Sequence, residues 1–446
     1  MENKMIKTQV CIIGAGAGGI GCAYRLIRNG VKVVVVDKNA DFGGTMVFGG
    51  VDGWEPGVTL DGLHRELYEN MREIGGCHVV KQVPNCNLVE SELCSDWSRH
   101  DFGRCPWALA FKSEYSYDDT FRRVPYLDAK RLQFDPDAMR VAIKQIFKPY
   151  RDVLTMLFGY KYLSCHTEGG RVASVTVSNG DEDVEIIADY FVDASGDIIL
   201  ARDAGCEVAF GCEGREEYGE PSAAEKSDKI NGATYVFRVG RSDDAEHVDT
   251  VPEEALSVDL HSLGLGDVCG RVSYVVEYPN GDFNFNMLPT MSGKLYFDLG
   301  DRADEVGRAA VWAYWHHLQM YKGMKGFTLK HIYDVGIREG YRLVGKYVLR
   351  EQDLRRGTLE FESEKIVAIA DHALDVHGES GMCKELERPY NIPIECAMTK
   401  ELDNLLVACR GASFSHIAAS SARLTRTMIS MGEGVGEYIS EKIANK

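Results

Sequence analysis

Two short apolar runs near the start of the chain are separated by a glycine-rich turn and a helical stretch. The runs are residues 10–13 and 33–36, and the helical stretch ends at Gly30. Short continuous apolar runs are typical of strands buried on both faces, as in a parallel sheet. The pattern therefore predicts a strand, a helix and a second, parallel strand within residues 8–45.

Apolar spacing predicts further elements along the chain. At residues 135–137, Asp-Pro-Asp places an acid at a helix N-cap and proline just inside the helix. Asn179-Gly180 is typical of a hairpin turn. Helices are expected at residues 60–74, 135–147, 198–204, 303–321 and 424–443, and strands at residues 154–158, 172–177, 185–192 and 404–408.

The turn after the first strand reads G-x-G-x-x-G from Gly14 to Gly19, with Gly18 inside it. In this pattern the first glycine permits the tight turn and Gly16 lets the backbone approach a pyrophosphate. Gly19 lets the helix pack closely on the strand. The free N–H groups and the dipole at the helix N-terminus favour phosphate binding. The alternative is an ordinary βαβ unit without a ligand, so the motif alone is a weak signal.

Asp37 ends the second strand, about 20 residues after the glycines, where an acid accepts hydrogen bonds from ribose hydroxyls. An acid at this position favours FAD or NAD over NADP. The following residues Lys38 and Gly43-Gly44-Thr45 extend the pattern.

The bulk numbers limit the function classes. With 446 residues, we expect two closely joined domains. The formal charge of −18 argues against nucleic acid as a partner, because phosphate contacts need clustered Lys and Arg. The thirteen scattered cysteines contain no C-x-x-C pair, so no metal site is expected and a reducing cytoplasm is favoured. The sequence predicts no signal peptide and no membrane span.

The pattern of elements predicts an α/β fold, in which a Rossmann-like FAD-binding domain holds an inserted α+β substrate domain. The FAD-binding domain is expected in three parts and the substrate domain in two. The former takes residues 1–75, 135–204 and 391–446, and the latter residues 76–134 and 205–390.

The chain resembles the bacterial FAD-dependent oxidoreductase family of the glutathione-reductase-like flavoprotein superfamily, some of whose members are labelled xanthan lyase. Four motifs carry the resemblance: the glycine fingerprint with Gly43-Gly44, the loop 50–57, the segment 192–197, and the C-terminal half from Arg338. Two residues depart from the family pattern. Ser195 replaces the usual Thr, and Cys409 stands where Gly is common.

The resemblance and the fingerprint together imply FAD as the cofactor, with the isoalloxazine ring between the domains. The helix after Ser413 would point its N-terminus toward the N1–C2=O edge of the ring, although a small-residue loop packed for steric reasons is the alternative. Asp197 would contact the cofactor or cap the helix at 198–204. The expected FAD-binding residues are Gly14, Gly16, Gly18, Gly19, Asp37, Lys38, Gly43, Gly44, Thr45, Ser195, Gly196, Asp197, Arg410 and Ser413.

Four residues are candidates for the chemistry. Arg338 and Arg342 are four apart and suit an anionic substrate, although a salt bridge to Glu339 or Glu351 explains them equally well. His377 and His416 are the candidate proton-transfer groups, because histidine titrates near neutrality; structural histidines are the alternative.

The leading hypothesis is a cytoplasmic FAD-dependent oxidoreductase that transfers a hydride between a small organic substrate and flavin N5. A flavin monooxygenase-like enzyme and a non-redox lyase that uses FAD structurally are the alternatives. A second G-x-G-x-x-G is absent from the sequence, so the electron partner stays open, as do the substrate and the oligomeric state.

Overall fold

The computed structural model describes most of the chain. The described residues are 4–54, 62–81, 130–259, 274–278, 280–286, 290–357, 363–377, 382–384 and 386–445. Most of the expected substrate-domain segment 76–134 lies outside them, as do residues 55–57 of the loop motif.

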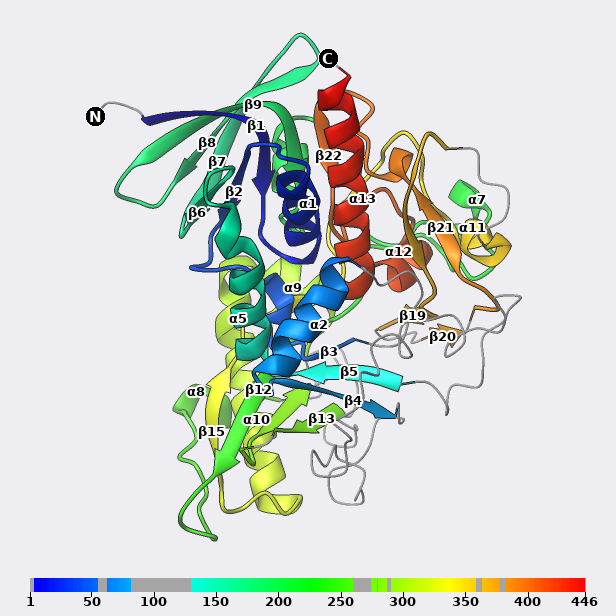
Figure 1. Ribbon diagram of the computed structural model, residues 1–446. Coiled ribbons are helices and arrows are strands. Elements are labelled where there is room, and N and C mark those ends of the chain that lie inside the picture. Colours follow the sequence, from blue (N-terminus) through cyan, green and yellow to red (C-terminus); the bar gives the residue numbers. More distant parts are fainter. Residues whose placement is uncertain are drawn as a thin grey trace.

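A seven-stranded sheet forms the larger part of the molecule (Figure 1). Five of its strands are parallel and two form an antiparallel hairpin. The strand order is β6-β2-β1-β9-β8-β7, and β22 also pairs with β9. The strands are β1 (Lys4–Ile13), β2 (Val33–Asp37), β6 (Leu154–Phe158), β7 (Lys161–Glu168), β8 (Arg171–Ser178), β9 (Asp183–Asp193) and β22 (Leu405–Val407).

The register brings the carboxyl ends of the parallel strands to one edge of the sheet. Ile13 of β1 pairs with Val36 of β2 and with Asp193 of β9, and Asp193 also pairs with Val407 of β22. In open α/β sheets, ligands bind outside this edge. The turn after β1 and the segments after β9 and β22 therefore meet where a ligand is expected.

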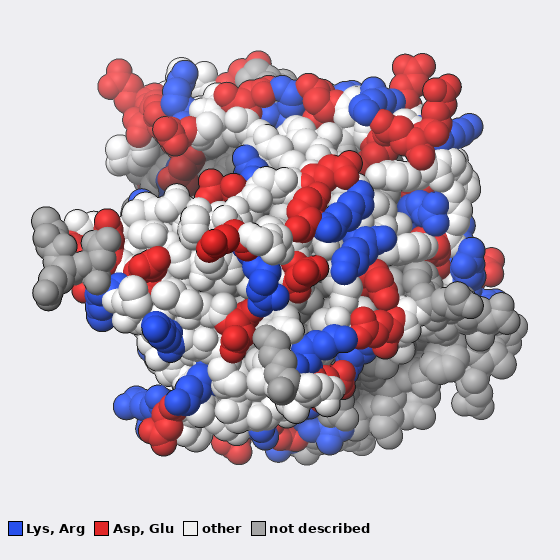
Figure 2. Space-filling view, turned by 90° about the horizontal axis from the view of Figure 1, so that it is seen from above, with Lys and Arg blue, Asp and Glu red and all other residues white. Residues whose placement is uncertain are grey.

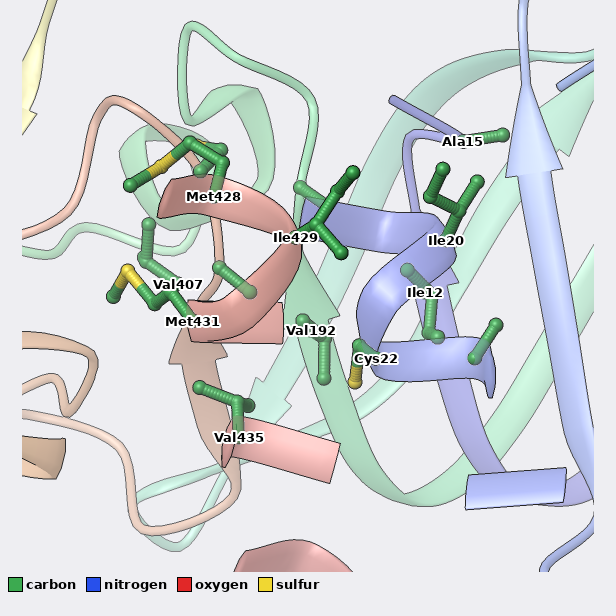
Figure 3. Close-up of a cluster of buried hydrophobic side chains, with 14 of the residues drawn as sticks. Ile12, Ala15, Ile20, Cys22, Val192, Val407, Met428, Ile429, Met431 and Val435 are labelled. Atoms are coloured by element: carbon green, nitrogen blue, oxygen red, sulfur yellow. The ribbon is translucent and has the colours of Figure 1, made fainter. Parts of the chain in front are cut away.

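Helix α1 (Ala17–Arg28) and helix α13 (Thr425–Ala444) cross on one face of this sheet (Figure 1). A Cβ on Gly432 would lie 2.1 Å from the carbonyl oxygen of Gly18, and one on Gly21 would lie 2.2 Å from that of Ile429. Glycine is therefore needed for the close contact of the two helices. Figure 3 shows the apolar side chains of both helices packed around Val192 and Val407 of the sheet.

Helices α2 (Leu63–Glu73) and α5 (Pro136–Phe147) pack together beside a small sheet. The carboxylate of Asp135 accepts the N–H of Asp137 at 2.9 Å, which confirms the N-cap expected there. The small sheet has the order β3 (Gly53–Trp54), β5 (Lys130–Phe134), β4 (Cys77–Lys81).

A second, antiparallel sheet lies at the opposite end of the molecule and is covered by α10 (Ala303–Tyr321) (Figure 1). Phe237, Phe285 and Trp315 form a core of their own there. Its strand order is β13 (Tyr274–Glu277), β14 (Phe283–Asn286), β12 (Val236–Arg241), β15 (Phe327–Ile332).

Short elements connect the two parts. The two-stranded pairs are β10 (Val208–Ala209) with β17 (Arg342–Leu343), β11 (Ala233–Thr234) with β16 (Gly336–Ile337), β18 (Ile366–Ala370) with β21 (Tyr390–Pro393), and β19 (Leu374–Val376) with β20 (Met382–Lys384). The helices are α6 (Ile199–Asp203), α7 (Arg215–Tyr218), α8 (Glu253–Leu256), α9 (Gly293–Leu299), α11 (Glu351–Arg356) and α12 (His416–Ala422). Four 3₁₀ turns complete them: η1 (Gly44–Met46), η4 (Lys148–Tyr150), η6 (Gly300–Arg302) and η7 (Ile394–Cys396).

The expected α/β fold with a parallel, Rossmann-like sheet is confirmed. The strands of the large sheet come from residues 4–37, 154–193 and 405–407, and the strands of the second sheet come from residues 236–332. On the face seen in Figure 2, acidic and basic side chains are interspersed rather than gathered by sign.

Candidate functional site

Two positions in the turn between β1 and α1 can be occupied only by glycine. Gly14 has φ +106°, and a Cβ there would lie 2.3 Å from the carbonyl oxygen of Ala194. A Cβ on Gly19 would lie 1.9 Å from the carbonyl oxygen of Gly14. The turn therefore packs tightly against the end of β9 and against its own helix, as the fingerprint requires.

Gly16 is different, because a Cβ at this position would meet no close protein atom. The nearest heavy atom to a Cβ on Gly16 is the Cα of Gly44, 3.9 Å away. Tight packing inside the protein therefore does not explain this glycine, whereas a pyrophosphate approaching the turn does. Gly18 packs against the sheet instead: a Cβ there would lie 1.7 Å from the carbonyl oxygen of Ala408, just after β22.

The glycine pair after β2 lies against the same turn. Gly44 has φ +49°, and a Cβ added to it would lie 2.8 Å from the Cα of Gly16. Gly43 has φ +120°, and its N–H donates to the carbonyl of Ala15 at 2.9 Å. Thr45 follows in the 3₁₀ turn η1 and is half-buried, and Lys38 is exposed.

The carboxylate of Asp37 already accepts two hydrogen bonds from the protein backbone. One oxygen accepts the N–H of Ala15 at 2.7 Å and the other the N–H of Asn39 at 2.8 Å. Burial raises the pKa of this carboxyl, and the two N–H donors oppose that shift. Each carboxylate oxygen has a second lone pair for a further donor, such as a ribose hydroxyl.

The segment after β9 is held by its own hydrogen bonds. The Ser195 hydroxyl donates to buried Asp193 at 2.6 Å and accepts the N–H of Ile199 at 3.0 Å. Asp193 also accepts the N–H of Ala201 at 2.9 Å, so these two residues hold the start of α6. Asp197 does not cap that helix: it accepts the N–H of Tyr341 at 3.1 Å and pairs with Arg202 at 2.8 Å.

Arg410 follows β22 and lies beside the turn at Gly196. A Cβ on Gly196, which has φ +85°, would lie 2.7 Å from Nη1 of Arg410. The Nε of Arg410 is buried and has no hydrogen-bond partner. A buried donor without a partner is costly, so a ligand acceptor at this position fits the structure. Ser413 is buried, and its hydroxyl accepts the N–H of Gly345 at 2.9 Å.

Arg342 lies in a buried cluster of ion pairs that we call the paired cluster: Glu213, Glu339, Arg342 and His416. Its guanidinium donates to Glu339, to Glu213 at 2.6 Å and to the carbonyls of Gly211 and Phe414. The salt bridge to Glu339 expected as an alternative is therefore present. The Arg342 side chain is fully used inside the protein and is not open to a substrate.

His416 is the first residue of α12, and it belongs to the paired cluster. Its Nδ1 lies 2.9 Å from both carboxylate oxygens of Glu339, and its N–H donates to Glu213 at 2.8 Å. The carboxylate of Glu339 outweighs burial and raises the pKa of His416 to about 10. The charges of His416 and Arg342 outweigh burial and lower the pKa of Glu339 to about 2. His416 is therefore a protonated partner of Glu339 at neutral pH.

Arg338, Asp375, His377 and Arg423 form a second group, which we call the open cluster. The Nε2 of His377 lies 2.6 Å from Asp375, and Arg423 lies 3.5 Å from the same carboxylate. Burial and the charges of Arg338 and Arg423 lower the pKa of His377 to about 4. His377 is therefore neutral at pH 7, with Nε2–H donating to Asp375.

Buried Asn231 joins the two clusters. Its backbone N–H and its side-chain amide donate to Glu339 at 3.0 and 2.6 Å, and its side-chain oxygen accepts the N–H of His377 at 2.7 Å. The structure thus brings Arg338, Arg342, His377 and His416 into one region. Sequence reasoning missed Asn231, Glu213 and Asp375, although Asp375 stands two residues before His377.

Among the residues that the structure describes, no group of His, Cys, Asp or Glu could hold a metal ion. None of the described helices combines the length and the apolar character that a membrane span requires.

Several known proteins match short parts of the chain. The glutamate synthase [NADPH] small chain of Escherichia coli is 50% identical over 71 residues, 16% of this chain and 13% of that protein. The putative oxidoreductase UacF of Escherichia coli is 24% identical over 213 residues, 45% of this chain and 31% of that protein. The matches span less than a third of the length of these relatives.

Solved structures also match the chain, at low sequence identity. A geranylgeranyl bacteriochlorophyll reductase-like protein from Thermoplasma acidophilum has a TM-score of 0.49 at 13% identity, covering 99% of this chain and 80% of its own. Aklavinone-11 hydroxylase, solved with FAD and aklavinone, has a TM-score of 0.47 at 12% identity, covering 98% and 63%.

The family comparison covers almost the whole chain. The model of the FAD dependent oxidoreductase family matches residues 9–446. FAD is the cofactor of this family, and two features of the site fit it: the open side of Gly16 and the unpartnered Nε of Arg410. The chain therefore belongs to the FAD dependent oxidoreductase family and is an FAD-dependent oxidoreductase.

Proposed function

We propose that the protein transfers a hydride between a small organic substrate and flavin N5, with His377 as the proton-transfer group. When bound, the flavin ring supplies the redox chemistry, and the protein has to hold it, orient the substrate and manage the proton. The observation that carries this proposal is the hydrogen bond of 2.6 Å between His377 and Asp375.

This hydrogen bond orients the imidazole. Because neutral His377 donates Nε2–H to Asp375, its Nδ1 keeps a lone pair that can accept a proton. A base that is held by a neighbouring carboxylate is a common arrangement for general acid–base catalysis. Burial and the charges of Arg338 and Arg423 lower the pKa of His377 and keep the imidazole unprotonated before the reaction.

His416 is poorly suited to the same task. Its pKa is raised to about 10, and its proton is shared with Glu339, so it has no lone pair to offer at neutral pH. Its place at the N-terminus of α12 supports a different role. The helix N-terminus adds positive potential there, which suits the negative charge that develops on a reduced flavin, whereas the charge of His416 is balanced by Glu339.

The residues after β1, β2 and β22 would hold the cofactor. We propose that the turn from Gly14 to Gly19 binds the pyrophosphate, that Asp37 binds the ribose, and that Arg410 donates its free Nε–H to the cofactor. The proposed contacts follow the carboxyl edge of the parallel strands, where ligands of such sheets bind.

The test is anaerobic reduction of the purified holoprotein by a panel of sugars, hydroxy acids and steroids, followed as bleaching of the flavin absorbance. We expect one FAD per chain and bleaching by at least one compound class. Absence of FAD after cofactor addition would contradict the proposal. An oxygenated product formed only in air, or a product formed without any change in flavin absorbance, would instead support a monooxygenase or a lyase.

A further inference from the structure

Arg338 is a half-buried cation with few partners. Its Nη1 donates to the carbonyl of Gly232 at 3.1 Å and to the hydroxyl of Thr234, and both acceptors are neutral. Burial and the neighbouring charge of Arg423 lower the pKa of Arg338 to about 9. The guanidinium therefore keeps its charge at neutral pH, and the hydrogen bonds that the structure gives it involve Nη1 alone.

In the part of the chain that the structure describes, Arg338 has no carboxylate within hydrogen-bond distance. Among the described residues, the carboxylate whose charge acts on it is Asp375. This carboxylate already accepts the hydrogen bond of His377 and lies 3.5 Å from Arg423. Within the described ranges, Asp375 therefore serves His377 and Arg423 as well as Arg338, and it forms no direct ion pair with Arg338.

Arg342, four residues further along the chain, is an arginine whose positive charge is fully compensated. It has two carboxylates, Glu339 and Glu213, and two carbonyl acceptors around a single guanidinium. A partly buried charge with no carboxylate of its own is unfavourable, so proteins keep one mainly where a ligand supplies the opposite charge. Arg338 meets this description and Arg342 does not.

Arg338 lies near the residues at the end of the proposed cofactor groove where the flavin ring would bind. The next residue, Glu339, binds His416 at the N-terminus of α12, and Gly340 packs against Asp197, where a Cβ would lie 2.4 Å from the carboxylate oxygen. Gly232 links Arg338 to His377, the proposed proton-transfer group. The Gly232 carbonyl accepts from Nη1 of Arg338 at 3.1 Å, and the Gly232 N–H donates to the carbonyl of His377 at 3.1 Å. An anion bound by Arg338 would therefore lie beside His377.

We infer that Arg338 is the anion anchor of the substrate site, and that the substrate is a small organic molecule bearing a carboxylate. The inference rests on the proposed function, and it separates the two arginines: Arg338 binds substrate, whereas Arg342 holds the protein together. The planar carboxylate matches the two-pronged donor geometry that guanidinium offers.

The test uses unreactive probes with the holoprotein. Acetate and benzoate are compared with acetamide and benzamide at constant ionic strength set by chloride. Binding is measured in two ways: as a change in flavin absorbance and as a rise in melting temperature. We expect both carboxylates to raise the melting temperature in a saturable manner, and the amides and chloride to have no such effect.

Three variants sharpen the test. We expect Arg338→Gln to weaken benzoate binding at least about tenfold, because a charge-assisted hydrogen-bond pair is lost, and Arg338→Lys to weaken it less. The matched control is Arg356→Gln in α11, since Arg356 is exposed and outside both clusters. The control should bind benzoate as the wild type does, and all three variants should retain FAD.

Two results would overturn the inference: equal responses to benzoate and benzamide, or unchanged benzoate affinity in Arg338→Gln. If Arg338→Gln fails to fold, the wild-type comparison and Arg338→Lys decide. Failure of the proposed function would be recognised separately, as loss of FAD from the wild type. The melting-temperature response to benzoate would still test the anchor in that case.

Discussion

Two arginine–histidine clusters lie on either side of Asn231, and they differ in how their charges are paired. In the paired cluster, Arg342 and protonated His416 face Glu339 and Glu213. In the open cluster, Arg338 and Arg423 share Asp375, and His377 is neutral. The sequence motifs do not distinguish the two clusters. We propose that completeness of pairing separates a structural ionic group from one that binds a ligand.

The largest expected effect is on the paired cluster. Glu339→Gln removes the carboxylate that faces both Arg342 and His416, leaving buried positive charge uncompensated. We expect a loss of about 3–5 kcal/mol in the free energy of unfolding, the range observed when one partner of a buried ion pair is removed. Urea unfolding followed by circular dichroism measures it.

The matched control for this change is Glu216→Gln in α7, because Glu216 is exposed. It should leave the unfolding free energy within about 0.5 kcal/mol of the wild type. Equal stability of the Glu339→Gln and Glu216→Gln variants would show that the paired cluster does not hold the fold together.

The second effect is on the open cluster and concerns rate. His377→Gln should slow anaerobic flavin reduction by a hydride-donating substrate about 100-fold or more, the usual contribution of a general acid or base. In the wild type, the acid limb of kcat/KM should fall near pH 4, the pKa of His377, and it should vanish in the variant. A rate in His377→Gln close to that of the wild type would assign the proton to another group.

The third effect concerns pH. As pH rises, the contributions of His377 and His416 to stability should change in opposite directions. The folded pKa of His416, about 10, is above its unfolded value of about 6.5, so its contribution to stability is present below pH 6.5 and is lost as pH rises toward 10. The folded pKa of His377, about 4, is below the unfolded value. Its contribution is present above pH 6.5 and is lost as pH falls toward 4.

Unfolding free energies of the wild type, His416→Gln and His377→Gln between pH 5 and 9.5 test this difference. Each histidine should add a slope of at most about 1.4 kcal/mol per pH unit in its own window. The same sign of slope for both histidines would contradict the assignment of their charge states.

The smallest expected effect is on the stability of the Arg338→Gln variant. Because Arg338 has no carboxylate of its own, removing its charge should change the unfolding free energy by less than about 1 kcal/mol. A loss as large as that of Glu339→Gln would mean that Arg338 is a structural ion-pair partner after all.

Much of the fold could be predicted from local pattern. The strand–helix–strand unit at the start, α10 and the N-cap at Asp135 all lie where apolar spacing and capping residues indicated. Strand β7 (Lys161–Glu168) was missed because most of its side chains are exposed, so no alternation of apolar and polar residues marks it. The N-terminal position of Asp197 suggested a helix cap, but its carboxylate binds Tyr341, far along the chain.

The candidate site was less predictable, for a physical reason. The glycine turn is local, and each of its close contacts follows from the motif. The state of His377 and His416 depends on Asp375, Glu339 and Asn231, which the fold brings together from separate segments. The spacing of Arg338 and Arg342 in the sequence does not distinguish their roles. The tertiary structure does, because it places two carboxylates beside Arg342.

We propose that the open cluster faces the substrate side of the flavin. A crystal structure of the protein with FAD and benzoate tests it most directly. We expect the pyrophosphate at Gly16 and a benzoate oxygen within about 3 Å of the Arg338 guanidinium, beside His377. A carboxylate bound elsewhere, with Arg338 paired to a carboxylate of the protein, would contradict it.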